Sequence, residues 1–228
     1  MKTELIVGLD LDARDQALIA VDACQPCEWF KIGSQLFTRC GPDIVREVRD
    51  LGKNVFLDLK FHDIPNTVAK AAKAAAGMGV KLITLHASGG RNMIAAAREA
   101  VEGTETRILA VTILTSLTDE MVRMEIGIPE CAAEAVPRLA RLAVESGAHG
   151  IVCSPQELQP VRTAIGTEPL VVTPGVRPVW ASKDDQARVL TPREAAQLGS
   201  SMIVVVRPIL KHPQPSEAVR LILEELNV

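Results

Sequence analysis

Short apolar runs alternate with longer segments of helical periodicity along this 228-residue chain, and the alternation occurs eight times. The runs are rich in Val, Ile and Leu, which is typical of parallel strands buried on both faces. Strand followed by helix, repeated, predicts an α/β fold. The predicted strands are Leu5–Leu9, Trp29–Ile32, Val55–Leu59, Leu82–Leu85, Ile108–Leu114, Gly150–Cys153, Leu170–Thr173 and Met202–Val206.

The intervening segments carry signals that begin and end helices. Thr191-Pro192-Arg193-Glu194 places Thr at the cap, Pro at the first helical position and Glu in the first turn. Several segments end with a glycine ahead of the next strand, which is typical of a helix end: Gly52, Gly79, Gly103, Gly147 and Gly199. The predicted helices are Asp15–Ala23, Asp43–Leu51, Val68–Met78, Asn92–Val101, Ala132–Glu145, Gln156–Ile165, Pro192–Leu198 and Pro215–Leu226.

Eight strand–helix units in this chain average about 28 residues each, close to the roughly 30 that one such unit needs. No space is left for another domain, so we expect residues 1–228 to form a single (β/α)8 TIM barrel. The alternative is an open doubly wound sheet, but no G-x-G-x-x-G motif follows the first strand, where Gly8 precedes Leu-Asp-Leu-Asp. The long connection 116–130 is expected to hold a short extra helix.

Composition and short motifs exclude several classes of protein. The charge is −3, and four Phe, two Trp and no Tyr leave little for base stacking, so no nucleic-acid partner is expected. The apolar run at the N-terminus is too short for a signal peptide, and no run could span a membrane, which predicts a cytoplasmic protein. Five scattered cysteines fit reduced thiols. Cys24 and Cys27 form a C-x-x-C without a nearby histidine, so no metal site is predicted.

Charged residues follow the first three predicted strands. Asp10 ends the first strand, Lys31 lies in the second, and Asp58 and Lys60 end the third. In barrel enzymes the chemistry lies at the carboxyl ends of the strands, so these four side chains are expected to meet at one mouth. Asp58 and Lys60 are two residues apart and therefore point to the same side. One such pair is usually a solvated ion pair of little consequence. Charges that adjacent strands each contribute at the same level of the barrel favour a functional site instead.

Carboxylates around Lys60 would keep its ammonium charged, which suits a proton donor. A lysine that forms a Schiff base needs an apolar or cationic neighbourhood instead. The pattern therefore favours general-acid chemistry at Lys60 over covalent catalysis.

The last two strands predict a phosphate site. Arg177 follows the seventh strand and Arg207 the eighth, and in this fold the loops at these places commonly bind phosphate. Two guanidinium groups would hold the anion with charge-assisted hydrogen bonds. The polar segment 174–189, which contains Gln186 and Trp180, is expected to close over the ligand, with Trp180 fluorescence reporting the closure.

The run Asp58-Leu59-Lys60-Phe61-His62-Asp63-Ile64-Pro65-Asn66-Thr67 resembles the signature of the orotidine 5′-phosphate decarboxylase family. Shorter matches follow in the family's order along essentially the whole chain, among them Phe30-Lys31-Ile32-Gly33, His86-Ala87-Ser88-Gly89-Gly90 and Thr173-Pro174-Gly175-Val176-Arg177. The resemblance implies a lyase that decarboxylates orotidine 5′-monophosphate to uridine 5′-monophosphate, the last step of de novo pyrimidine (UMP) biosynthesis. It also implies a homodimer without a metal or organic cofactor.

The resemblance also implies roles for individual residues. Lys60 matches the proton donor to C6 of the pyrimidine, and Asp58 the carboxylate beside the leaving group. Lys31 joins this charge network, and Asp10 and Lys31 match ribose contacts. The remaining matches are Asp63 and Thr67, which reach the neighbouring subunit's site, Thr115 at the pyrimidine, and Arg177, Gln186 and Arg207 at the phosphate.

One position departs from the family's pattern. The residue before the arginine after the eighth strand is usually Gly, whose backbone N–H meets the phosphate, and here it is Val206. A β-branched residue adopts positive φ poorly, and its methyl groups would crowd the phosphate. We therefore expect weaker substrate binding than in a variant with glycine at this position.

Two rival functions compete with this one. Sugar-phosphate enzymes of the same suprafamily share the Asp-x-Lys-x-x-Asp pattern but use Mg²⁺, and Ile64-Pro65-Asn66-Thr67 fits the orotidylate branch better. The second alternative is a non-catalytic barrel that binds nucleotides, and the complete charge network argues against it. His62 and His86 are expected to be structural.

Overall fold

The computed structural model describes residues 2–181 and 190–227, and eight strands in this part of the chain form a closed parallel barrel. Each strand pairs with the next in sequence, and the last pairs with the first, which closes the barrel. The predicted (β/α)8 barrel is confirmed, and the open-sheet alternative is wrong. The strands are β1 (Glu4–Gly8), β2 (Trp29–Gly33), β3 (Asn54–Phe61), β4 (Leu82–His86), β5 (Arg107–Val111), β6 (Gly150–Val152), β7 (Leu170–Pro174) and β8 (Met202–Val205).

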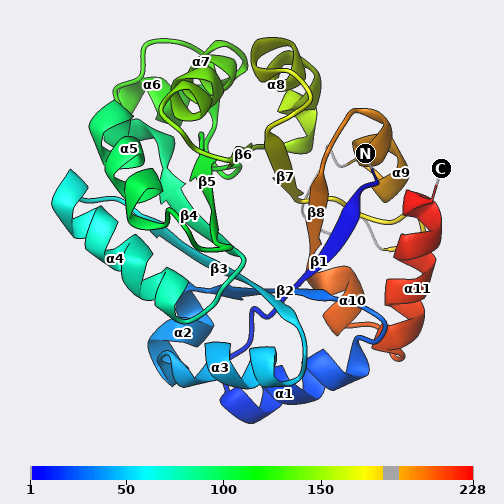
Figure 1. Cartoon of the computed structure of the whole chain (residues 1–228). Helices are drawn as coiled ribbons and strands as arrows, with labels where there is room; N and C mark the ends of the chain where they lie inside the picture. Colours follow the sequence, from blue (N-terminus) through cyan, green and yellow to red (C-terminus); the bar gives the residue numbers. More distant parts are fainter. Residues whose placement is uncertain (1, 182–189, 228) are drawn as a thin grey trace.

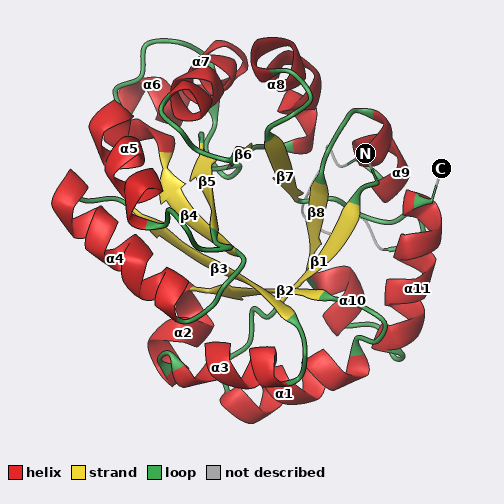
Figure 2. Cartoon of the chain, in the orientation of Figure 1, coloured by secondary structure: helices red, strands yellow, loops and turns green. Residues whose placement is uncertain are grey.

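Helices surround the strands and cover the outside of the barrel (Figures 1 and 2). They are α1 (Arg14–Ala23), α2 (Ser34–Cys40), α3 (Asp43–Asp50), α4 (Pro65–Gly77), α5 (Gly90–Ala100), α6 (Asp119–Met124), α7 (Ala132–Glu145), α8 (Leu158–Ile165), α9 (Pro192–Gln197), α10 (Arg207–Leu210) and α11 (Pro215–Leu226), with 3₁₀ turns η1 (Ala87–Gly89) and η2 (Pro155–Glu157). The extra helix expected within 116–130 is α6. Two short helices, α2 and α10, were not predicted.

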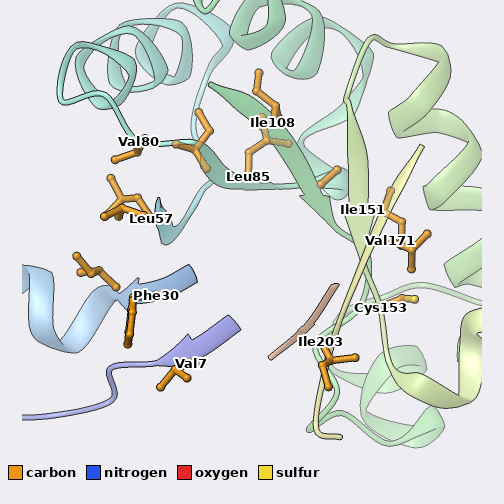
Figure 3. Packing of buried hydrophobic residues seen from close by; sticks show 14 of the residues in the cluster. Val7, Phe30, Leu57, Val80, Leu85, Ile108, Ile151, Cys153, Val171 and Ile203 are labelled. Carbon is orange, nitrogen blue, oxygen red and sulfur yellow. The ribbon is translucent and has the colours of Figure 1, made fainter. Parts of the chain in front are cut away.

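Two apolar clusters hold the barrel together. The larger one joins the outward face of the strands to the helices, and Figure 3 labels a member from each of the eight strands, from Val7 of β1 to Ile203 of β8. The smaller cluster alternates with it along the strands and therefore fills the inside of the barrel. Its buried members are Ile6, Phe56, Leu82, Leu109, Val172, Met202 and Val204. Branched aliphatic side chains thus dominate both layers, as the scarcity of aromatics requires.

Local signals in the sequence fix several helix ends. Thr191 caps α9 as predicted, because its hydroxyl accepts the Glu194 N–H while the Glu194 carboxylate accepts the Thr191 N–H. Gly79 and Gly147, which follow α4 and α7, have φ of 72° and 96°. No helix in the described part of the chain is both long enough and apolar enough to cross a membrane.

Candidate active site

A cavity of about 690 Å³ opens at the carboxyl ends of the strands. This volume lies in the range of small-molecule sites. Every strand except β4 contributes a lining residue itself or through the loop that follows it. The described residues that line it and were predicted for the site are Asp10, Lys31, Asp58, Lys60, Thr115, Arg177, Val206 and Arg207.

The four charged residues from the first three strands line this cavity and form a row of alternating charges, called the Asp/Lys chain here. Lys31 Nζ lies 2.9 Å from Asp10 Oδ1 and 3.7 Å from Asp58 Oδ2. Lys60 Nζ lies 2.8 Å from each carboxylate oxygen of Asp58. Asp58 is almost completely buried. A charge at such a place is tolerated only when it is paired, and each carboxylate here faces at least one ammonium.

The backbone that carries Asp58 and Lys60 is irregular. Leu57 of β3 pairs with Ile83 of β4, whereas Phe61 pairs with Leu85, so residues 58–60 lie opposite Thr84 alone. Lys60 has φ of 53°, and it is the one non-glycine residue with positive φ in the described part of the chain. A bulge of this kind re-aims a side chain, and left-handed backbone at a non-glycine residue marks local strain.

The part of the cavity lining that follows β7 and β8 is cationic. Arg177, in the loop after β7, is buried, and Arg207, the first residue of α10, is exposed. Lys211 belongs to the same part of the lining, one helical turn after Arg207, and was not predicted. Its place in the i+4 position from Arg207 is the signal that could have identified it. Apolar side chains from β5, β6 and β8 also line the cavity.

Val206 lines the cavity and packs against the inner cluster of the barrel. The expected conflict with positive φ does not arise, because Val206 has φ of −123°. Its Cγ2 lies only 2.5 Å from the point that a Cβ at Gly8 would occupy. The Cγ2 methyl group of Val206 therefore occupies the space that a side chain at residue 8 would need.

Three residues predicted for the site are not among the described lining residues. Asp63 and Thr67 lie exposed at the start of α4, where the Asp63 carboxylate accepts the Ile64 N–H. Gln186 lies outside the described residues, as does the second half of the segment expected to close over the ligand, residues 182–189. Trp180, at the described edge of that segment, packs against His212 with ring centroids 5.4 Å apart.

His62 and His86, near the charge network, contact each other, with ring centroids 5.2 Å apart. Burial lowers the pKa of His86, and the neighbouring His62 and Lys60 lower it further. Cys24 and Cys27 are buried free thiols, and burial raises their pKa values to about 12 and about 11. In the described part of the chain, no group of three or more His, Cys, Asp or Glu is placed to hold a metal ion.

Comparison with known proteins gives a consistent result. A relative from Heliobacterium modesticaldum, named orotidine 5′-phosphate decarboxylase, is 47% identical over 236 residues, which is 99% of this chain and 96% of that protein. A relative of the same name from Opitutus terrae is 48% identical and covers both chains completely. The crystal structure of orotidine 5′-phosphate decarboxylase from Lactobacillus acidophilus superposes with a TM-score of 0.89 at 38% identity, over 99% of this chain and 100% of that one.

The family description orotidine 5′-phosphate decarboxylase / HUMPS matches residues 3–222. The resemblance noted from the sequence is thereby confirmed, together with the expectation of a decarboxylase, a carboxy-lyase. The chain belongs to the orotidine 5′-phosphate decarboxylase / HUMPS family.

Proposed function

We propose that this protein decarboxylates orotidine 5′-monophosphate to uridine 5′-monophosphate, with Lys60 as the proton donor. The observation that carries the proposal is a row of alternating charges in the same cavity as two arginines. The row consists of Asp10, Lys31, Asp58 and Lys60, and the arginines are Arg177 and Arg207. The cavity thus offers charged groups for a reacting carboxylate and separate cations for a phosphate. The names of the relatives support the same substrate.

In the proposed reaction the bond between C6 of the pyrimidine and its carboxylate breaks, CO₂ leaves, and the electron pair stays on C6. The Lys60 ammonium stabilises this developing charge and then donates a proton to C6, which gives uridine 5′-monophosphate. The neutral amine regains its proton from solvent. Lys60 is held by two hydrogen bonds to Asp58, so its ammonium is oriented before substrate arrives.

Asp58 and Lys31 complete the proposed centre. Asp58 fixes Lys60 and faces the substrate carboxylate, while Lys31 compensates Asp58 at 3.7 Å and Asp10 at 2.9 Å. In this proposal Asp10 and Lys31 contact the ribose, and Thr115 contacts the pyrimidine. Arg177 and Arg207, together with Gln186 from outside the described residues, bind the phosphate in this proposal. The neighbouring backbone N–H of Val206 adds a contact.

We also propose a homodimer in which Asp63 and Thr67 complete the neighbouring site. Both residues are exposed and neither lines the cavity of its own chain, which supports a role toward another subunit. The proposal includes a cytoplasmic location, supported by five free cysteines, and one catalytic domain over residues 1–228.

The ultraviolet absorbance of orotidine 5′-monophosphate tests the reaction directly. The absorbance of the substrate is expected to change at the same rate when the purified protein is assayed with and without EDTA. Absence of turnover with tight substrate binding would favour a non-catalytic barrel. Turnover that disappears in EDTA and returns with Mg²⁺ would favour the metal-dependent sugar-phosphate branch.

A further inference from the structure

Thr84 is a polar residue in the middle of an apolar strand. β4 reads Leu-Ile-Thr-Leu-His, and the Thr84 side chain is completely buried. A buried hydroxyl is unfavourable unless its hydrogen bonds are made. The partners of this hydroxyl therefore show what the residue does.

Both hydrogen bonds of the Thr84 hydroxyl go to the residues proposed for catalysis. The hydroxyl donates to Asp58 Oδ1 at 2.9 Å and accepts the backbone N–H of Lys60 at 2.9 Å. The hydroxyl thus uses its O–H donor and one acceptor lone pair in hydrogen bonds with residues of β3. Asp58 in turn accepts both hydrogen bonds from Lys60 Nζ, so the three residues form a closed network.

The register of the barrel explains why a side chain takes this place. Residues 58–60 of β3 lie opposite Thr84 alone, because the pairs on either side are Leu57 with Ile83 and Phe61 with Leu85. The Lys60 N–H is therefore paired with a hydroxyl where a regular parallel ladder would offer a carbonyl. Lys60 is also left-handed there, with φ of 53°. Such a conformation persists only when its surroundings hold it.

We propose that Thr84 is a positioning residue for the decarboxylation. Its hydroxyl holds the Asp58 carboxylate and the Lys60 backbone in the arrangement that aims the ammonium into the cavity. The inference rests on the proposed function, because it concerns catalysis only if Lys60 donates the proton.

Thr84 does not line the cavity, so it acts through Asp58 and Lys60 and not through the substrate. Its loss should therefore affect kcat and leave the affinity for ground-state ligands nearly unchanged. Replacing a residue that only stabilised the fold would change neither kcat nor the ligand affinity of the folded protein.

The test replaces Thr84 with valine, which keeps the shape and removes the hydroxyl. We expect Thr84→Val to lower kcat by about 10- to 100-fold, because small displacements of catalytic groups have effects of this size. The Kd for uridine 5′-monophosphate should stay within about twofold of wild type. Thr84→Ser restores the hydroxyl and should recover most of kcat. If the valine variant does not fold, Thr84→Cys, whose thiol is a weaker hydrogen-bonding group, replaces it with the same expectation.

The matched control is Thr106→Val. Thr106 is also a buried threonine, directly before β5, and its hydroxyl donates to the Val80 carbonyl at 2.7 Å. It lies away from the cavity lining, so this variant should lose thermal stability and keep kcat.

The outcomes separate the inference from the proposed function. If the wild-type protein turns over the substrate and Thr84→Val keeps its kcat, the positioning role is wrong and the function stands. An equal loss of kcat in Thr84→Val and Thr84→Ser overturns the role of the hydroxyl as well. If the wild-type protein has no turnover, the function fails, and the inference that depends on it fails too.

Discussion

At the scale of single residues, burial decides which side chains depend on their partners. Asp58 is buried and accepts hydrogen bonds from both Lys60 and Thr84. The Asp-x-Lys spacing in the sequence predicted that Asp58 and Lys60 share a side, and the ion pair agrees. The sequence pattern does not single out Thr84, because its strand reads as apolar. A single polar residue in such a run was the available signal, since a buried hydroxyl needs partners.

Val206 provides a first test at this scale. We expect Val206→Gly to lower the KM for orotidine 5′-monophosphate by about threefold to tenfold, through relief of roughly 1 kcal/mol of crowding at the phosphate. Steady-state kinetics measure this effect. Uridine, which has no phosphate, is the control ligand, and its affinity should not change. An unchanged KM and kcat/KM would show that the Val206 methyl groups do not obstruct the substrate.

Glu157 predicts a pH dependence of stability. Burial raises its pKa to about 7 from an ordinary value of 4.5, against the opposing effect of the hydrogen bond from the Ser154 N–H. Between these pH values the folded protein keeps a proton that the unfolded chain has released. Stability from this group is therefore fully present below pH 4.5 and is lost as the pH rises through about 7.

Glu157→Gln removes this titration and retains an oxygen that can accept the Ser154 N–H. The difference in free energy of unfolding between the variant and the wild type should shift in favour of the variant by up to about 3 kcal/mol from pH 4 to pH 8. Urea denaturation across this range measures it. A difference that stays constant with pH would contradict the burial of an ionisable carboxyl at this position.

At the scale of elements, periodicity and caps predicted the strands and the main helices. The predicted helix Ala132–Glu145 coincides with α7, and the start of α9 was predicted from its capping residues. The short helices α2 and α10 were missed because each is too short to show a helical repeat. The bulge in β3 was missed because the inward and outward alternation of its side chains continues through it, and only the pairing with β4 reveals it.

The cap of α9 gives the prediction at this scale. Thr191→Ala removes the hydroxyl that accepts the Glu194 N–H and should lower the free energy of unfolding by about 1 kcal/mol. Thr163→Ala is the control, because Thr163 is exposed within α8 and alanine is the better helix former there. Denaturant unfolding of the two variants should separate them. Equal losses would show that the cap contributes no more than an ordinary surface threonine.

At the scale of the whole molecule, the eight strand–helix units determined the fold, and closure of the barrel brought the distant charges together. Asp10 and Asp58 come from different strands, and Lys31 from β2 lies between them. The sequence could predict this meeting because the carboxyl ends of parallel strands share one face. Lys211 was missed because its place in the cavity depends on the short helix α10, although its i+4 spacing from Arg207 is visible in the sequence.

A mixing experiment tests the proposed dimer. Lys60→Ala and Asp63→Ala are each expected to be nearly inactive alone. In a mixed dimer one site keeps both Lys60 and the neighbour's Asp63, so refolding the two variants together should restore about a quarter of wild-type activity. No recovery, despite formation of mixed dimers, would show that Asp63 does not serve the neighbouring site.

The most direct test is the turnover of orotidine 5′-monophosphate by Lys60→Ala beside Lys53→Ala. Lys53 precedes the same strand at the opposite end of the barrel, where its ammonium contacts Gln25 and Glu28. Loss of charge stabilisation and of the proton donor together should lower kcat of Lys60→Ala by about 10⁴-fold or more. Lys53→Ala should keep kcat near the wild-type value. A folded Lys60→Ala variant that retains a substantial part of wild-type turnover would contradict the assignment of Lys60 as the proton donor.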